Sequence, residues 1–170
     1  MRKNLAIGMA FVAVLAVASF SARAGDDDNP AALAKALSEA SVSLDQGFKA
    51  SGGEGKPISG KFEGPDAALQ LSVYTMKGDQ FAEVLVDHNS GLIRNSEPIT
   101  DPDDLKDAKE QGEAMGKAKL SLAAAVTSAV ESLNGFRAVS AVPMLDGGRP
   151  VASVTLMKGE EVKKVTEKLD

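Results

Sequence analysis

One short pattern occurs twice in this chain, and it constrains the fold more than any other feature of the sequence. The stretch 72–80 reads SVYTMKGDQ and the stretch 152–161 reads ASVTLMKGEE, so Ser-Val-x-x-Met-Lys-Gly followed by an acid recurs at an offset of 81. Upstream, Ser43-Leu44 matches Ser121-Leu122 at an offset of 78, which indicates a gap of three residues in the intervening connector. Matches that keep their order across one gap predict a structural unit that has been duplicated.

The first predicted unit opens with a helical pattern. Pro30 suits a first helical turn, and Asp28 or Asn29 can cap it. An apolar stripe at steps of three and four follows, formed by Leu33, Leu37, Ala40, Leu44 and Phe48. That spacing is typical of one buried helix face. The capping-box pattern from Ser43 to Gln46 leaves open a break near Ser43.

The second unit opens in a similar way. The stretch 101–104, Asp-Pro-Asp-Asp, reads as a helix start with acids in its first turn, where they interact favourably with the helix dipole. The apolar stripe is then carried by Met115, Leu122, Val126, Ala129 or Val130, and Leu133. Gly112 and Gly116 weaken the middle of this segment. One long helix and two helices, at about 103–114 and 121–133, both remain open.

Each unit then reads as three strands. The expected ranges are 57–63, 67–76 and 80–86 in the first unit, and 136–145, 151–157 and 161–169 in the second. Apolar and polar residues alternate at 70–74 and at 153–156, as one-sided burial in an antiparallel sheet predicts. The repeated Lys-Gly-acid stretches then form tight turns into each last strand, where the backbone needs glycine.

The last segment, 161–169, fits two structures. Val162, Val165 and Leu169 are spaced for a helix, and their Lys and Glu neighbours are good helix formers. The register of the repeat favours a strand, and a charged edge strand is a usual protection against edge-to-edge pairing. We therefore expect a strand.

These patterns predict an α+β fold class. We expect two repeated α-β-β-β units whose helices pack on antiparallel sheets, with the option that both sheets join into one larger sheet. The expected division is a signal peptide at 1–24, a first unit at 25–95, a linker or helical connector at 96–114 and a second unit at 115–170.

The first 24 residues have the pattern of a secretory signal peptide. Residues 2 and 3 are basic, residues 5–20 are almost wholly apolar, and Ala-Arg-Ala at 22–24 precedes an expected cut between Ala24 and Gly25. The alternative is an N-terminal membrane anchor, but the apolar run is shorter than the roughly 20 residues of a spanning helix. We expect a periplasmic or secreted protein with no stable membrane anchor after signal removal.

Charge and composition exclude several classes of protein. The chain has no Cys, which rules out thiol catalysis, iron–sulfur clusters, Cys-based zinc sites and lipoprotein attachment. Removal of the signal leaves 16 Lys and Arg against 24 Asp and Glu, a net charge of −8, so nucleic acid and anionic lipid are poor partners. Trp is absent and aromatic residues are 4%, which disfavours a base-stacking surface.

The stretch 81–93, FAEVLVDHNSGLI, resembles the closing strand and turn of the PepSY domain family. The matching residues are Val86-Asp87, then Ser90, Gly91 and Leu92 after two intervening residues. In such a turn Asp87 and Ser90 can cap backbone N–H groups, and Gly91 takes the left-handed conformation. The second unit departs from the pattern, because it ends in KLD without the Ser-Gly pair. The resemblance is therefore clearer over 40–93 than over 120–170.

The resemblance implies an exported, non-catalytic module that binds or regulates a protein partner in the cell envelope, such as a peptidase or a sensor. The family brings no catalytic motif and no cofactor. The paired arrangement is similar to the tandem architecture of beta-lactamase inhibitor protein, but not to its sequence. We expect recognition through a sheet face, a sheet edge or the loop 95–103. The alternative is a small-ligand or metal-binding periplasmic protein that uses the groove between the two repeats.

Candidate reactive groups are few. His88 is the single histidine, so a two-histidine metal site is impossible, and we expect an exposed turn residue. The acid clusters at 26–28 and 101–104 lack the spacing of a calcium loop, and the glycine-rich stretch 52–55 has neither the Walker lysine pattern nor the following helix of a phosphate loop. The methionines at 76, 115, 144 and 157 are isolated and suit a core. We therefore expect no catalytic, cofactor-binding or metal-binding residues, and no enzyme activity.

Overall fold

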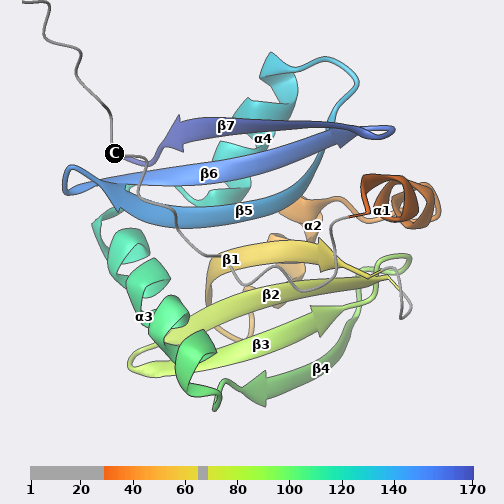
Figure 1. Ribbon diagram of the computed structural model, residues 1–170. Helices are drawn as coiled ribbons and strands as arrows, with labels where there is room; N and C mark the ends of the chain where they lie inside the picture. Colours follow the sequence, from red (N-terminus) through yellow and green to blue (C-terminus); the bar gives the residue numbers. More distant parts are fainter. Residues whose placement is uncertain (1–28, 65–68) are drawn as a thin grey trace, which may run out of the picture.

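A single antiparallel sheet of seven strands organises the described part of the chain (Figure 1). The computed structural model describes residues 29–64 and 69–170, so the predicted signal peptide and its cleavage site at Ala24 and Gly25 lie outside the described residues. The strands are β1 (Lys56–Glu63), β2 (Gln70–Lys77), β3 (Gln80–Val86), β4 (Ile93–Pro98), β5 (Arg137–Asp146), β6 (Arg149–Lys158) and β7 (Glu161–Lys168).

The strand order is β4-β3-β2-β1-β5-β6-β7, so the two halves of the chain meet at the centre of the sheet. The seam between them is short, since β1 and β5 pair only through Gly60 with Ala141 and Lys61 with Ser140. Consecutive strands on each side form hairpins, as the tight turns predict. The α+β class, the antiparallel pairing and the joining of the strands into one sheet are therefore confirmed.

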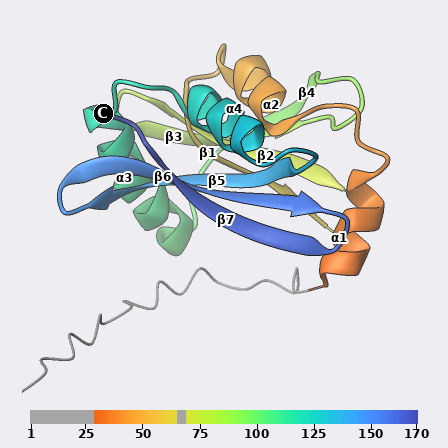
Figure 2. The same ribbon diagram turned by 90° about the horizontal axis from the view of Figure 1, so that it is seen from above.

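Four helices accompany this sheet in the described residues. They are α1 (Pro30–Leu37), α2 (Leu44–Ser51), α3 (Pro102–Lys117) and α4 (Leu122–Ser132). Helices α2 and α4 lie side by side on one face, whereas α3 crosses the other face at one end of the sheet (Figures 1 and 2). The side chains of β2 contact helices on both faces of the sheet: Leu71 lies against Gly47 of α2, and Met76 lies against Gly112 of α3.

The expected helix from Pro30 to Phe48 is two helices. Ser43 ends the connection between them, and its backbone N–H donates to Gln46 Oε1 at 2.8 Å in a capping box that starts α2. Helix α1 starts as expected, with Asn29 Oδ1 accepting from the N–H of Ala32. The second helical segment is also two helices, because Ser121 caps α4 through the N–H of Ala124. Two helices therefore precede each set of hairpins.

The expected loop at 95–103 is wrong in its first part, because Ile93–Pro98 forms the edge strand β4. All six of its side chains are exposed, so the sequence carries no apolar alternation that could reveal a strand. Pairing with β3 alone defines it. The predicted boundaries at residues 95 and 114 fall inside β4 and α3, so neither marks a break in secondary structure.

The core extends over both faces of the sheet, beneath the helix pair α2–α4 on one face and beneath α3 on the other. Its largest fully buried side chains are Leu44, Ile58, Leu71, Met115, Leu122, Leu156 and Leu169. Segment 161–168 is the expected strand, because Val165 packs on this core while Val162 faces the other side and is 45% exposed. No helix in residues 29–64 and 69–170 is both long and apolar enough to cross a membrane.

Candidate functional site

The two edges of the sheet differ in the backbone groups that they leave unpaired. In an antiparallel ladder, alternate residues direct both N–H and C=O toward the neighbouring strand. The N–H of Leu169 donates to Pro150, so the odd-numbered residues of β7 face β6 and the even-numbered ones face outward. The outward set is Val162, Lys164, Thr166 and Lys168. It contains no proline, and β7 has no register shift against β6.

The edge at β4 is closed by its own residues. The N–H of Ile99 donates to Phe81, so Ser96 and Pro98 are the outward-facing residues of this strand's second half. Asn95 Oδ1 accepts the N–H of Ser96 at 2.9 Å, and Pro98 has no N–H. A short edge with a proline and a capped donor resists strand addition. β7 is therefore the edge that is better suited to main-chain pairing.

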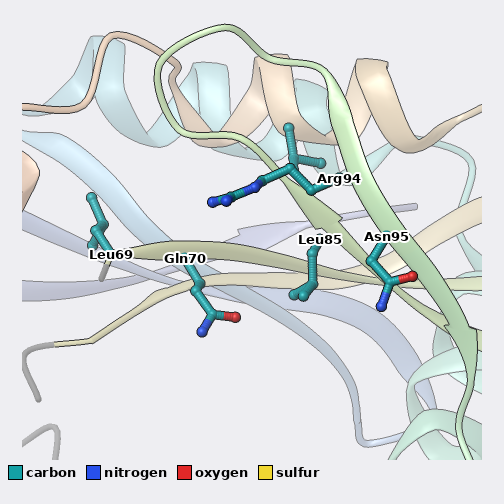
Figure 3. Close-up of a pocket in the computed structure, with 6 residues that line it drawn as sticks. Leu69, Gln70, Leu85, Arg94 and Asn95 are labelled. Carbon is teal, nitrogen blue, oxygen red and sulfur yellow. The ribbon is translucent and has the colours of Figure 1, made fainter. Parts of the chain in front are cut away.

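A hollow of about 390 Å³ lies over β3, between the start of β2 and β4 (Figure 3). We call it the β4 hollow; it is lined by Leu69, Gln70, Leu85, Val86, Arg94 and Asn95. The guanidinium of Arg94 extends from β4 across the hollow toward the start of β2 (Figure 3). Gln70 and Asn95 add amide groups, and no acid lines the hollow among the described residues. This lining can bind an acceptor group, but it offers no nucleophile or base.

The turn that carries the family resemblance positions Arg94. Asp87 Oδ1 accepts from the N–H of Asn89 at 3.0 Å, from the N–H of Ser90 at 2.8 Å and from Ser90 Oγ at 3.0 Å. Gly91 has a φ of +74°, a conformation that favours glycine. The other oxygen, Asp87 Oδ2, lies 3.9 Å from Arg94 Nε. Hydrogen bonds from Ser90 and Asn89, and then the charge of Arg94, hold the pKa of the Asp87 carboxyl below its ordinary value of 3.8.

A second hollow of about 390 Å³ lies between α2 and α4. This α2–α4 groove is lined by Ser43, Leu44, Asp45, Val126, Thr127, Val130, Glu131, Phe136, Arg137 and Ala138. It is the groove between the two halves that the sequence offers as an alternative site. Asp45 is already engaged there, since its carboxylate accepts from Ser43 Oγ at 2.6 Å and pairs with Lys49 at 3.0 Å.

Arg137 connects the two halves of the chain beneath this groove. Its Nη1 donates to the carbonyls of Leu37 and Ala40, both at 2.9 Å, and its Nη2 donates to the carbonyl of Val42. The guanidinium carbon also lies 5.0 Å from the centre of the Phe62 ring. Burial lowers the pKa of this guanidinium, yet arginine stays charged at any physiological pH. Both Nη atoms donate within the fold, so Arg137 supports the groove, whereas its buried Nε has no hydrogen-bond partner among the described residues.

Several positions weighed in the sequence lie apart from these hollows. His88 is partly buried rather than exposed, and its carbonyl accepts from the N–H groups of Ser41 and Val42. Asp101 caps α3 through the N–H groups of Asp103 and Asp104, as a helix start should. In residues 29–64 and 69–170, no group of three or more His, Asp or Glu residues could hold a metal ion.

Sequence reasoning overlooked Gln70, Arg94, Arg137 and the outward row of β7. One signal in the sequence could have pointed to Arg137. The repeat offset of 81 aligns it with Lys56, another cation at the start of a central strand. Lys56 Nζ donates to the carbonyl of Met115 in α3. The outward row of β7 required the register of the sheet, which depends on pairing between distant residues.

Comparisons with known proteins add little to this geometry. No protein-family model matches the chain, and no curated protein matches it. A solved structure from Clostridium difficile 630, described as a "putative lipoprotein", is similar with a TM-score of 0.41 and 13% identity; the match covers 72% of this chain and 81% of that protein. A likeness at this level carries no argument about function. The resemblance to the PepSY family therefore stays a prediction from the residues of the 81–93 stretch.

Proposed function

We propose that this chain is an exported, non-catalytic binding module of the PepSY type, built from two duplicated units. Its partner is a protein of the cell envelope, such as a peptidase or a sensor. The signal-peptide pattern supports export, and the stretch 81–93 supports the family. The β4 hollow holds hydrogen-bond donors and apolar side chains without a nucleophile or base, which is consistent with binding without turnover. In the α2–α4 groove, the hydroxyl–carboxylate pair of Ser43 and Asp45 belongs to the cap of α2, and Asp45 also pairs with Lys49.

Equivalent backbone contacts in the two halves support the proposed duplication. The carbonyl of His88 accepts from the N–H groups at 41 and 42, and the carbonyl of Leu169 accepts from those at 119 and 120. The donors are related by the offset of 78 and the acceptors by the offset of 81, as in the sequence repeat. Lys56 and Arg137 follow the same rule, because they reach the carbonyls of Met115 and Leu37.

The observation that carries the binding proposal is the open edge of β7. Four successive outward residues leave their N–H and C=O groups without a neighbouring strand in the described residues. An extended segment of a partner can add to such an edge and form a regular ladder of main-chain hydrogen bonds. β7 is eight residues long, which is enough for a partner strand of ordinary length.

Replacing Thr166 with proline tests this proposal. Thr166 directs its N–H outward, so proline removes a donor from the free edge but none from the pairing with β6. We expect Thr166→Pro to lose the partner in affinity capture from envelope extracts, with a melting temperature close to that of the wild type. Thr166→Val keeps the N–H and a similar shape, so it should retain the partner. Equal capture by both variants would refute binding through this edge.

The alternative function is binding of a small ligand in the α2–α4 groove, and the 390 Å³ hollow between the helices favours it. Its lining is mainly apolar, which suits an apolar compound better than a metal ion. Native mass spectrometry of the protein purified from its own envelope would detect a retained compound. A bound mass that disappears in Val130→Trp, a change at a half-buried position that lines the groove, would support this alternative.

A further inference from the structure

The two sides of β7 carry different kinds of side chain. On the side of α4, Lys163 Nζ lies 4.6 Å from the centre of the Phe136 ring and pairs with Glu161 at 3.1 Å. Glu167 on the same side accepts from Ser128 Oγ at 2.9 Å. The charges on this side therefore already have partners within the protein.

The side that faces away from α4 carries two lysines for which no partner is found in the described part of the chain. Its row consists of the outward residues Val162, Lys164, Thr166 and Lys168, all of them exposed. Neither Lys164 nor Lys168 makes a hydrogen bond or ion pair with any described residue. The adjacent row of β6 on this side holds Val151, Ser153, Thr155 and Met157, and no acid. An acidic chain thus presents a local positive stripe on its open edge.

The exposed lysine side chains and the unpaired backbone groups of β7 belong to the same set of residues. The even-numbered positions that point their lysines to this side also direct their N–H and C=O groups outward. A strand added to β7 would place residues i and i+4 beside Lys164 and Lys168, with residue i+2 beside Thr166. Main-chain bonds would supply attachment, and the two lysines would select among partner sequences.

We propose that β7 binds an extended acidic segment of the partner, with carboxylate side chains at positions i and i+4. This inference rests on the proposed function of the β7 edge and specifies the class of partner. Cross-strand pairs of opposite charge favour the acidic segment, whereas like charges placed opposite each other disfavour a basic one. A segment with neutral residues at both positions gains the main-chain bonds alone.

The test is an NMR titration of the ¹⁵N-labelled protein with three blocked peptides. They are acetyl-TEVTVET-amide, its glutamine counterpart acetyl-TQVTVQT-amide and its lysine counterpart acetyl-TKVTVKT-amide. We expect the glutamate peptide to shift the amide signals of 162–168 and to bind about fivefold more tightly than the glutamine peptide. High salt should remove most of this difference, because exposed charge pairs are screened.

A charge reversal sharpens the test. The double variant Lys164→Glu and Lys168→Glu should invert the preference, so that the lysine peptide binds most tightly. Lys35→Glu with Lys109→Glu makes the same change in net charge at exposed positions on α1 and α3. This matched control should keep the preference for the glutamate peptide, which separates the effect of the stripe from that of overall charge.

The possible outcomes test the acidic preference and the proposed edge function separately. Equal binding of the glutamate and glutamine peptides at β7 would overturn the acidic preference and leave the edge function standing. If none of the three peptides shifts the β7 amides, the edge does not accept strands and the proposed function fails with it. Concentration-dependent broadening of the same signals without peptide would assign the edge to a second copy of the chain, which would also overturn the inference.

Discussion

Replacing Arg137 with alanine should lower the free energy of unfolding by about 2–4 kcal/mol, because charged hydrogen bonds to partly buried carbonyls are each worth about 1.5–3 kcal/mol and are not additive. The change removes three hydrogen bonds, to Leu37, Ala40 and Val42, together with the contact to the Phe62 ring. All of these groups belong to the first half of the chain, so the loss weakens the attachment of α1 and of the connection to α2. Urea denaturation followed by circular dichroism measures the effect.

Two further variants give this prediction its controls. Arg137→Lys keeps the charge but lacks the planar guanidinium, which reaches three carbonyls at once. This variant should therefore recover only part of the lost stability. Arg149→Ala removes an exposed arginine for which no hydrogen bond or ion pair is found among the described residues, and should change stability by less than about 0.5 kcal/mol. An Arg137→Ala protein as stable as Arg149→Ala would show that the two halves hold together without this side chain.

Adding a single methyl group at Gly60 should destabilise the protein by about 1–3 kcal/mol, the usual cost of overpacking a core. A Cβ at this position would lie 2.5 Å from Phe48 Cε1 and 3.0 Å from Phe48 Cζ. The Phe48 ring is only 3% exposed and is held by α2 above the centre of the sheet. The ring cannot move aside without displacing the helix, so Gly60→Ala should lower the urea midpoint.

Gly116 provides the matched glycine for comparison. A Cβ added there meets no atom within 4 Å, and Gly116 lies inside α3. Alanine is favoured over glycine in a helix by about 1 kcal/mol, so Gly116→Ala should leave stability unchanged or raise it. If Gly60→Ala also left the midpoint unchanged, the packing of Phe48 on β1 would be looser than the structure indicates.

Together these contacts explain why the edge at β7, the proposed site of partner binding, can remain open. The short β1–β5 seam has only two residue pairs, so Arg137, Lys56 and the α2–α4 contact supply the rest of the attachment between the halves. The sheet therefore does not depend on its outer edges for stability. β7 can keep its outward backbone groups unpaired, while β4 closes its own with Asn95 and Pro98.

Much of the local structure could be predicted from the sequence because its signals are local. The strand at 70–76, the glycine turns and the helix start at Asp101 each depend on signals within a few residues of chain, and the structure has them where the patterns indicate. The sequence alone leaves the break at Ser43 open, because the apolar stripe continues across it and does not distinguish one helix from two.

The amino-acid sequence by itself determined the elements with a periodic apolar pattern, the hairpins at 70–86 and 137–168 and the turn at Asp87–Gly91. Only the tertiary structure decided that Ile93–Pro98 is a strand, that Arg137 binds the carbonyls of the other half and which backbone groups of β7 face outward. The physical reason is the range of the interactions. Caps, turns and periodicity are local, whereas edge pairing and the arginine contacts join residues that are brought together only when the whole sheet assembles.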